Sequence, residues 1–246
     1  METHLTPAQW QVIKKHLPHL KMKRKHSLKK ILEAMFYVVK TGCHWRMLPK
    51  CYPKWQLVYY YFSKWRDLDI WQDLNDMIRE QVRQKLGKKA TASVGIIDSQ
   101  SVSTTTRGGL RGIDGNKKVK GRKRHIVVDT QGNLLTVLTH VANIHDSKGA
   151  DLVFKRLSEN IRGIKKIFAD SGYRGQLIER TKIKYGYSLE IVKKTTKAIS
   201  PKRWIVERTF AWMQSFRRLS KDFEYLLESS EAMVYLASLR LLLNKF

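Results

Sequence analysis

Three carboxylates in this sequence have the residue type and the surroundings of a metal site. Asp98 closes the apolar run VGII, Asp170 closes the run IKKIFA, and Glu207 lies in the helical pattern PKRWIVERTFAWMQ. Magnesium prefers oxygen ligands, so two or three carboxylates with a substrate phosphate are enough to hold it. Two such ions about 4 Å apart activate an attacking oxygen and stabilise a leaving one. These residues therefore predict metal-dependent phosphodiester chemistry.

The overall charge supports a nucleic-acid substrate. The chain carries 48 Lys and Arg against 21 Asp and Glu, a net charge of +27. Such a surface attracts phosphate backbones. An acidic group in a phosphate-binding groove adds repulsion unless a bound cation offsets its charge. Acids that follow buried strands in so basic a protein favour metal-dependent chemistry on nucleic acid.

The basic residues are clustered, which solubility alone does not require. One cluster lies between Lys14 and Lys30, and another occupies a glycine-rich loop from Arg107 to Arg124. Glycines let the backbone approach DNA closely, so we expect this loop to grip phosphates. The residues of the loop that are predicted to contact DNA are Lys117, Lys118, Lys120, Arg122, Lys123 and Arg124.

Length and composition limit the class of protein. The 246 residues suffice for one large domain or for a small and a medium one. No apolar run approaches the roughly 20 residues of a membrane span, and no secretory pattern opens the sequence. Cys43 and Cys51 fit a reducing cytosol, and their spacing around His44 matches no common zinc pattern. We expect a cytoplasmic protein.

Caps and apolar periodicity predict four helices in the first 88 residues, followed by the linker GKKATAS. In the second helix, Ser27 provides a cap and Gly42 a stop. In the third, Lys54 and Lys64 lie away from the apolar stripe and are predicted to face DNA. Two helices joined by a short loop, the second basic on one side, fit a helix-turn-helix-like module. The predicted helices span about residues 7–17, 28–42, 54–65 and 69–85.

From Val94 onwards, short β runs alternate with helical segments. SVGIID and IKKIFAD are predicted to be buried strands, and RHIVVD and LLTVLTHV to form a hairpin. We expect Asp146 or Ser147 to cap the next helix, and Pro201 to open the helix that carries Glu207. This order predicts an α/β fold with a mixed sheet and flanking helices. Ligands bind at strand ends in such sheets.

Simpler roles exist for the acidic residues. An aspartate after a strand is often a turn or cap residue, and we expect these roles for Asp129 and Asp146. Arg203 lies one helical turn before Glu207, so it either forms an exposed ion pair with the glutamate or contacts phosphate.

Other side chains suggest a covalent nucleophile. Tyr173, three residues after Asp170, would fit a phosphotyrosine mechanism, although the acidic triad already accounts for the site. A serine nucleophile would have to come from residues that are more simply the alternating polar positions of one strand face. Those serines are Ser99, Ser101 and Ser103.

The motifs that follow one another after Val94 are IIDSQS, DGNKKVKGRKRHIVVDTQG, ANIHDSKGA, FADSGYRG and PKRWIVERTFAWMQSFRRLSKDFE. Together they resemble bacterial insertion-sequence transposases of the DDE class, of the insertion-sequence-five type. LTPAQWQVIKKHLP and KTGCHWRMLPKCYPKWQLVYYYFSKWRDLDIW resemble the helical domain in front of that catalytic core. The resemblance covers nearly the whole chain, and the ordered set of motifs is specific.

The resemblance implies a ribonuclease-H-like mixed sheet with flanking helices over residues 89–246, preceded by a small all-helical DNA-binding domain over residues 1–88. The catalytic, metal-binding triad falls on Asp98, Asp170 and Glu207, and the DNA-contacting arginine on Arg203. The implied cofactors are two Mg²⁺ or Mn²⁺ ions. The implied partners are double-stranded element ends and target DNA, bound by a homodimer or higher oligomer in the bacterial cytoplasm, on the nucleoid. The implied reaction is strand cleavage followed by strand transfer.

Two alternatives and two departures accompany this resemblance. A DNA-binding regulator derived from a transposase has no use for the acids, and a ribonuclease-H-like nuclease cuts strands without joining them. A related signature has a basic residue seven positions after the glutamate, where this chain has Gln214, with Arg217 and Arg218 nearby. The segment KKTTKAISPKRW is a few residues shorter than is usual in the family.

Overall fold

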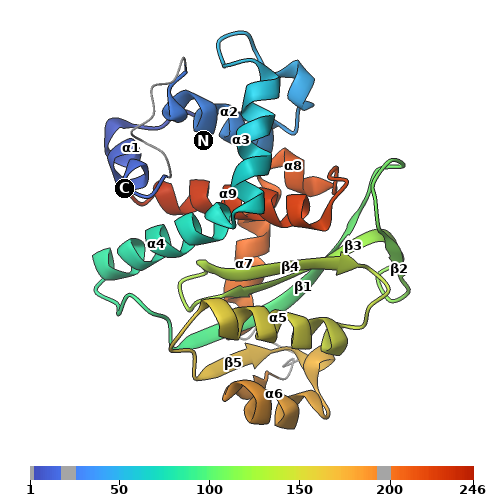
Figure 1. The fold of residues 1–246 in the computed structure, drawn as a ribbon. Helices are drawn as coiled ribbons and strands as arrows, with labels where there is room; N and C mark the ends of the chain where they lie inside the picture. The colour runs from blue at the N-terminus through green and yellow to red at the C-terminus, as the bar shows by residue number, and fades with distance from the viewer. Residues whose placement is uncertain (1–2, 18–25, 193–200) are drawn as a thin grey trace.

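Six strands form one mixed sheet in the parts of the chain that the structure, a computed structural model, describes, which are residues 3–17, 26–192 and 201–246 (Figure 1). The strands are β1 (Val94–Ser103), β2 (Gly112–Asp114), β3 (Val119–Val128), β4 (Leu134–Val141), β5 (Lys166–Ala169) and β6 (Ser188–Ile191). No helix within the described ranges is long and apolar enough to cross a membrane.

Helices cover both faces of this sheet and form a layer at one end. They are α1 (Pro7–Lys14), α2 (Leu28–Thr41), α3 (Trp55–Asp67), α4 (Ile70–Lys85), α5 (Asp146–Asn160), α6 (Leu177–Tyr185), α7 (Pro201–Gln214), α8 (Arg217–Ser220) and α9 (Leu227–Leu243). Two 3₁₀ turns are η1 (Trp45–Met47) and η2 (Ser171–Tyr173). Residues 193–200, which belong to the segment predicted to be short for the family, lie outside the described residues.

The strand order is that of a ribonuclease-H-like sheet. β3 runs antiparallel to β1 along one edge and antiparallel to β2 and β4 along the other. On the far side of β1, β5 and β6 continue the sheet in parallel. The longer strands therefore follow the order β4, β3, β1, β5, β6. The predicted α/β class, a mixed sheet with flanking helices, is confirmed.

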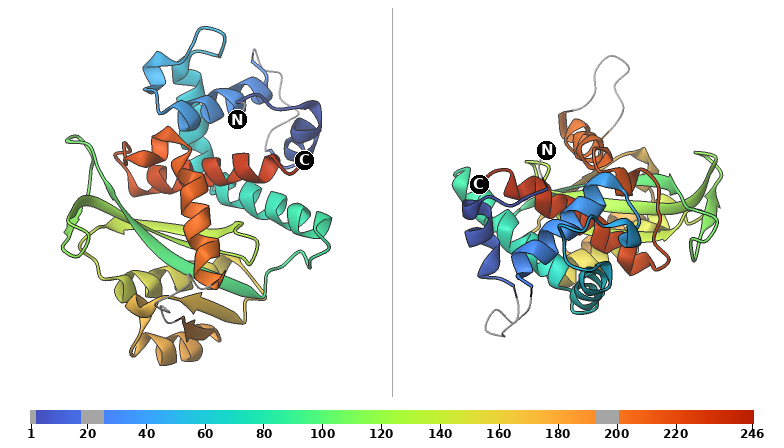
Figure 2. Two further views of the ribbon diagram at one scale, coloured as in Figure 1. Left: turned by 180° about the vertical axis from the view of Figure 1, so that it is seen from behind. Right: turned by 90° about the horizontal axis from the view of Figure 1, so that it is seen from above.

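Alternation along the strands divides the apolar residues between two cores. Ile96 and Ile126 point to one face, where they share a core with residues of α7 and α9. Ile97 and Val127 point to the other face, where they share a core with residues of α5. This division follows from the period of two along a strand. Figure 1 shows α5 in front of the sheet, and Figure 2 shows α7 crossing the opposite face.

The C-terminal helix α9 belongs to the helical layer. Its buried residues join those of α1, α2, α3 and α4 in one core, which also includes one face of the sheet. Figure 1 shows α9 lying between α2, α3 and α4 on one side and the sheet on the other. The predicted domain boundary near residue 88 therefore separates segments that share a core, and it stays a prediction.

Local signals set the ends of several helices. The Ser27 side chain accepts a hydrogen bond from Lys30 N at 3.3 Å at the start of α2. Gly42, with φ of 72°, ends that helix in the left-handed conformation that glycine adopts without strain. Thr6 and Gln9 form a reciprocal capping box at the start of α1. The caps of α2 at Ser27 and Gly42 lie where the sequence predicts them.

Among the boundary predictions that are wrong, two concern β1 and α5, while β3 begins at Val119, before the predicted RHIVVD, and α1 ends at Lys14. β1 continues five residues beyond Asp98, because its residues as far as Ser103 pair with β3. The cap of α5 is His145, whose ring nitrogen accepts a hydrogen bond from Ser147 N, so the helix begins at Asp146. The extension of β1 depends on a distant partner, β3, which the local pattern does not reveal, whereas the cap of α5 is a local hydrogen bond one residue earlier than predicted.

Three of the basic residues that are predicted to contact DNA lie on β3, where their side chains are buried in the protein interior. Arg122, Lys123 and Arg124 are 0%, 5% and 3% exposed. Arg122 and Arg124 reach Asp222 at 3.3 Å and 3.5 Å, and Arg122 also donates to backbone carbonyls beyond it. Lys123 binds Asp146 at 2.8 Å on the other face. Because their donors are used inside the fold, the predicted DNA contacts of these three residues are wrong.

Replacing Arg122 by Met should strongly destabilise the protein. The change leaves the buried Asp222 carboxylate short of a partner, and losing one member of a buried ion pair costs about 3–5 kcal/mol. Urea unfolding followed by circular dichroism measures this loss. Lys155→Met is the matched control, since Lys155 is 68% exposed and lies 4.0 Å from Glu159. A loss for Arg122→Met no larger than that of the control would contradict a framework role for this arginine.

Candidate active site

Strand register sets Asp98 and Asp170 side by side. β1 and β5 pair in parallel with Ile96 opposite Phe168, so two residues further along each chain Asp98 comes opposite Asp170. Residues two apart on a strand point to the same face. Both carboxylates therefore lie on the face that α7 covers. They share a small pocket with Ile96, Ile97, Phe168, Ala169, Val192, Arg203 and Val206.

The backbone next to each aspartate holds its carboxylate. Asp98 Oδ1 accepts a hydrogen bond from Ser99 N at 2.7 Å. Asp170 Oδ1 accepts one from Gly172 N at 2.9 Å, and in this way Asp170 caps η2. No hydrogen bond to either Oδ2 atom is found within the described residues. Each carboxylate is therefore oriented and keeps an oxygen for a ligand.

The charge of Asp98 is poorly compensated. Burial raises the pKa of the Asp98 carboxyl to about 6, and the negative charge of Asp170 adds to the rise. The hydrogen bond from Ser99 and the positive charges of Lys117 and Arg203 oppose it. A carboxylate with a raised pKa beside a second carboxylate is the arrangement that a bound cation relieves.

Helix α7 brings Arg203 and Glu207 to this site. Arg203 Nη2 donates to Glu207 Oε1 at 3.0 Å, and the two side chains are 17% and 38% exposed. Arg203 also lines the pocket of the aspartates, and its charge lowers the pKa of Asp98. The structure therefore brings Asp98, Asp170 and Arg203 together, and Glu207 adjoins them through the arginine.

The donor atoms suit a magnesium or manganese ion. Asp98 and Asp170 offer carboxylate oxygens, which these hard cations prefer. Within the described residues, no three His, Cys, Asp or Glu side chains are grouped closely enough to hold an ion as they stand. Glu207 is engaged by Arg203 instead. The oxygens of the two aspartates fit such a cation, whereas Glu207 is paired with Arg203 in the structure.

Three lysines of the β2–β3 hairpin remain exposed, namely Lys117, Lys118 and Lys120. The hairpin projects from the end of the sheet (Figure 1). Lys117 Nζ donates to Ser99 O at 3.1 Å, and its charge acts on Asp98. The hairpin tip therefore carries positive charge beside the aspartates.

The remaining predicted DNA contacts lie on α3. Lys54 is exposed directly before that helix. Lys64 is half-buried, with Nζ 5.8 Å from the centre of the Tyr60 ring. Both lysines belong to the helical layer and neither lines the aspartate pocket.

Arg217 and Arg218 are the basic residues that lie near Gln214, and Arg218 is not available to take its place. Arg218 is buried, where its Nε donates to Glu224 Oε1 at 2.7 Å. Arg217 is exposed. Gln214 itself is exposed and lines a small pocket beside Gln100.

Sequence reasoning missed the role of Asp146. Its Oδ1 accepts from Ser99 Oγ at 3.1 Å and from Lys123 Nζ at 2.8 Å. A methyl group on Gly172 would lie 3.1 Å from Asp170 Oδ1 and 3.5 Å from Asp146 Oδ2. Both carboxylates therefore lie close to this glycine. Only the tertiary fold brings Asp146 to the site, since its local context is that of a helix start.

The covalent alternatives do not fit the structure. Tyr173 is fully buried, and burial raises the pKa of its hydroxyl well above the ordinary value, so it is a poor nucleophile. Ser99 and Ser101 donate to the carboxylates of Asp146 and Asp114, at 3.1 Å and 2.6 Å. The serines are the polar positions of one strand face, and Ser99 and Ser101 hold acids in place.

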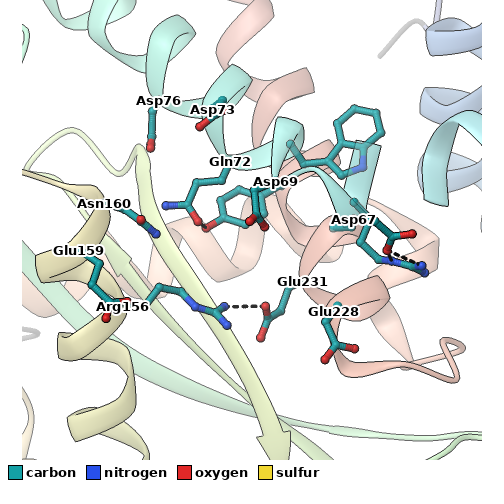
Figure 3. Close-up of a pocket in the computed structure, with 14 residues that line it drawn as sticks. Asp67, Asp69, Gln72, Asp73, Asp76, Arg156, Glu159, Asn160, Glu228 and Glu231 are labelled. Atoms are coloured by element: carbon teal, nitrogen blue, oxygen red, sulfur yellow. Dashed lines mark hydrogen bonds and ion pairs between the residues drawn. The ribbon is translucent and has the colours of Figure 1, made fainter. Parts of the chain in front are cut away.

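A cavity of about 620 Å³ lies elsewhere, between α4, α5 and α9 (Figure 3). Seven acidic residues and two arginines line it, and none of them belongs to the aspartate pocket. Figure 3 shows Arg156 bound to Glu231 on one side of it, with Asp73 and Asp76 on another. Burial raises the pKa of Asp76 to about 6, although Arg79 opposes the rise. So negative a cavity repels DNA phosphates.

Comparison with known proteins points to one family. Residues 89–242 match a family described as a transposase DDE domain, and residues 5–75 match one described as candidate transposases of the IS4/5 type. A protein of Burkholderia cepacia, described as a candidate transposase for insertion sequence element IS402, is 32% identical over 115 residues. That match covers 42% of this chain and 54% of the relative, so the chain spans about half the length of the curated relative.

Solved structures align at low similarity. The catalytic core domain of BIV integrase aligns with a TM-score of 0.38 and 15% identity, over 60% of this chain and 81% of its own. The Mos1 strand transfer complex aligns with a TM-score of 0.36 and 10% identity, over 93% of this chain and 78% of its own.

The metal-free protein should become more stable when Asp98 is replaced by Asn. The pKa of Asp98 rises from 3.8 to about 6, so ionisation of this residue opposes folding increasingly between about pH 4 and pH 6. At pH 7.5, Asp98→Asn should gain up to about 3 kcal/mol over the wild type. At pH 4 the difference should disappear. Urea unfolding in EDTA measures both values.

Magnesium provides the control for this prediction. Saturating Mg²⁺ at pH 7.5 should stabilise the wild type and leave Asp98→Asn unchanged. A variant that is no more stable than the wild type at pH 7.5 in EDTA would mean that the fold already compensates the Asp98 charge.

Proposed function

The chain belongs to the family of transposases with a DDE domain, and on that premise we propose that it binds the ends of an insertion sequence, cuts them and joins them to target DNA. The observation that carries the proposal is the register of β1 and β5. It sets Asp98 opposite Asp170 within the matched region, where Arg203 of α7 lines the same pocket.

Asp98 and Asp170 are the residues proposed to hold divalent ions, with Glu207 as the third ligand. Two bound Mg²⁺ or Mn²⁺ ions would activate the attacking oxygen and stabilise the leaving oxygen of an in-line displacement. The raised pKa of Asp98 supports this assignment, because a carboxylate that is costly to ionise gains most from a cation. The family match supports divalent metal chemistry in general.

Arg203 is proposed to exchange its partner when DNA binds. In the structure, its guanidinium offsets the carboxylates of Glu207 and Asp98. A planar guanidinium also binds phosphate through two parallel hydrogen bonds. On transfer of Arg203 to a DNA phosphate, Glu207 is released to join the two aspartates. Arg203 then holds the scissile strand in place without taking part in the bond changes.

Water and then DNA supply the nucleophile. In the first step, a water oxygen attacks phosphorus, the bond from phosphorus to the 3′ oxygen breaks, and a free 3′-hydroxyl and a 5′-phosphate result. In the second, that hydroxyl attacks a target phosphodiester, and the target strand leaves with its own 3′-hydroxyl. No protein side chain bonds to phosphorus, and the burial of Tyr173 supports this route.

The proposed substrates are double-stranded element ends and target DNA. The exposed hairpin lysines beside the aspartates support a phosphate contact close to the cleavage site. Lys54 and Lys64 of the helical layer are proposed to contact the ends further away. Joining both ends of one element at one target needs two active sites, so we propose a homodimer or higher oligomer on the DNA. Its place of action is the bacterial cytoplasm, on the nucleoid, where such DNA lies.

Replacing Asp98, Asp170 or Glu207 by Ala should abolish cleavage and joining. DNA affinity should stay the same or rise slightly, because each change removes a negative charge. The assay incubates the protein with Mg²⁺ and labelled DNA that carries the sequences flanking its own gene, and resolves nicked and joined products.

Glu179→Ala is the matched control, since it removes an exposed carboxylate from α6. Near-normal cleavage by any of the three variants would remove that residue from the proposed set of ligands. Nicked products without joined ones from the wild type would identify a nuclease that does not transfer strands.

Neutralising Lys117, Lys118 and Lys120 together by Gln should weaken binding to all DNA sequences alike. Each lost phosphate contact reduces the slope of log affinity against log salt by about 0.9, so the slope should fall by up to about three. Fluorescence anisotropy at several salt concentrations measures it.

The control for this change carries Lys155→Gln, Lys182→Gln and Lys184→Gln, which remove three exposed lysines from α5 and α6. Its slope should change less than that of the hairpin variant. A sequence-selective loss with an unchanged slope would mean that the hairpin reads bases.

A further inference from the structure

The face of β1 opposite Asp98 carries a buried polar cluster that the proposed chemistry does not use. Its members come from four separate segments and meet behind the two aspartates. They are Ser99 of β1, Lys123 and His125 of β3, Asp146 of α5 and Tyr173 of η2.

A buried lysine holds the Asp146 end of the cluster. Lys123 is 5% exposed, and its Nζ lies 2.8 Å from Asp146 Oδ1 and 3.5 Å from Asp114 Oδ2, and donates to Ile144 O at 2.9 Å. Asp146 Oδ1 also accepts from Ser99 Oγ at 3.1 Å. The Lys123 ammonium is buried, whereas the Asp146 side chain is 25% exposed, and burying an ammonium costs several kcal/mol before attraction to a carboxylate offsets it. Apolar residues of similar size would fill this space without that cost.

Tyr173 and His125 form the other end. The tyrosine hydroxyl and His125 Nδ1 are hydrogen-bonded at 3.1 Å, and both side chains are fully buried. His125 Nε2 has no hydrogen-bond partner within the described residues and lies 4.0 Å from Asp146 Oδ1. Burial lowers the pKa of His125 to about 3, so the ring is neutral. The imidazole therefore stands between the tyrosine and the Asp146 carboxylate.

Both ends of the cluster connect directly to the aspartates. Ser99 follows Asp98 and donates its backbone N–H to that carboxylate. Tyr173 ends the 3₁₀ turn that Asp170 caps. Gly172 lies between Asp170 and Tyr173 in the sequence. A methyl group added to it would lie 3.1 Å from Asp170 and 3.5 Å from Asp146.

The register of β1 and β5 sets the two aspartates opposite each other, but the backbone pairing itself stops short of them. The ladder between β1 and β5 ends with the pair Ile96 and Phe168. Asp98 and Asp170 lie two residues beyond that pair, where β5 has already ended. Like charges at this position repel each other, and a further connection between the two segments opposes that repulsion.

We propose that Asp146, Lys123, His125 and Tyr173 form a brace that fixes the Asp170 turn against β1 and so sets the distance between Asp98 and Asp170. The inference rests on the proposed function, since the spacing matters for a pair of metal ligands. These are positioning residues, because none of them touches the pocket of the aspartates. Outer-shell partners of this kind are worth about 10- to 100-fold in metal affinity or activity.

Tyr173→Phe tests the brace, because it removes one hydroxyl and keeps the ring that fills the core. Isothermal calorimetry with Mn²⁺ measures the dissociation constant, which should rise about 10- to 100-fold. Tyr235→Phe is the matched control. Tyr235 is also buried, its hydroxyl donates to Gln72 Oε1 at 2.9 Å, and it lies on α9 outside the cluster. Its Mn²⁺ affinity should stay within about twofold of the wild type, whatever melting temperature it loses.

Equal Mn²⁺ affinity for Tyr173→Phe and the wild type would overturn the brace. So would an equal loss of affinity in Tyr235→Phe, which would reveal a general effect of lowered stability. If Tyr173→Phe does not fold, Ser99→Ala replaces it, since that change removes the hydroxyl that links β1 to Asp146. The Mn²⁺ affinity of Ser99→Ala is then compared with those of the wild type and Tyr235→Phe, and the same results support or overturn the brace.

Asp98→Ala separates the brace from the function on which it rests. It should lose Mn²⁺ binding altogether. If the wild type binds no Mn²⁺, or if Asp98→Ala binds it as the wild type does, the proposed metal site fails and the brace fails with it. If Asp98→Ala loses the ion and Tyr173→Phe keeps it, the brace alone is wrong.

Discussion

Repulsion between two carboxylates that the strand register sets side by side is the constraint on which this structure depends. The parallel pairing of β1 with β5 brings Asp98 opposite Asp170, and burial raises the pKa of Asp98 to about 6. Without a metal ion, the fold offsets this charge only in part, through Arg203 and Lys117. The structure is therefore less stable at the place where a cation is proposed to bind, as is common at functional sites.

The large positive charge of the chain serves two purposes that composition does not separate. Exposed lysines of the β2–β3 hairpin present charge beside the aspartates, whereas Arg122 and Arg124 are buried against Asp222. These internal pairs tie β3 to the segment between α8 and α9. Some of the basic residues that the sequence suggests as DNA contacts, Arg122 and Arg124, therefore stabilise the fold instead. Net charge predicts that the partner is a nucleic acid, whereas burial determines which basic residues can contact it.

Local sequence signals predict the structural features that depend on nearby residues. The features that depend on long-range pairing are not predictable from them. Ser27 and Gly42 set the ends of α2, and the motif order identified the family, which the match over residues 89–242 confirms. The full length of β1 was not predictable, because its extension depends on β3. Asp146 was assigned to a helix cap, since nothing near it in the sequence reveals Ser99 and Lys123 as partners. The roles of Asp98, Asp170 and Glu207 stay predictions.

We propose above all that Asp98, Asp170 and Glu207 gather around divalent ions when DNA is bound. Anomalous diffraction from Mn²⁺ in crystals of the protein with its element-end DNA tests it most directly. We expect manganese between Asp98 and Asp170, with Glu207 as a ligand and Arg203 moved from Glu207 to a DNA phosphate. Manganese bound elsewhere, or absent from the aspartates while Arg203 keeps its 3.0 Å bond to Glu207, would contradict it.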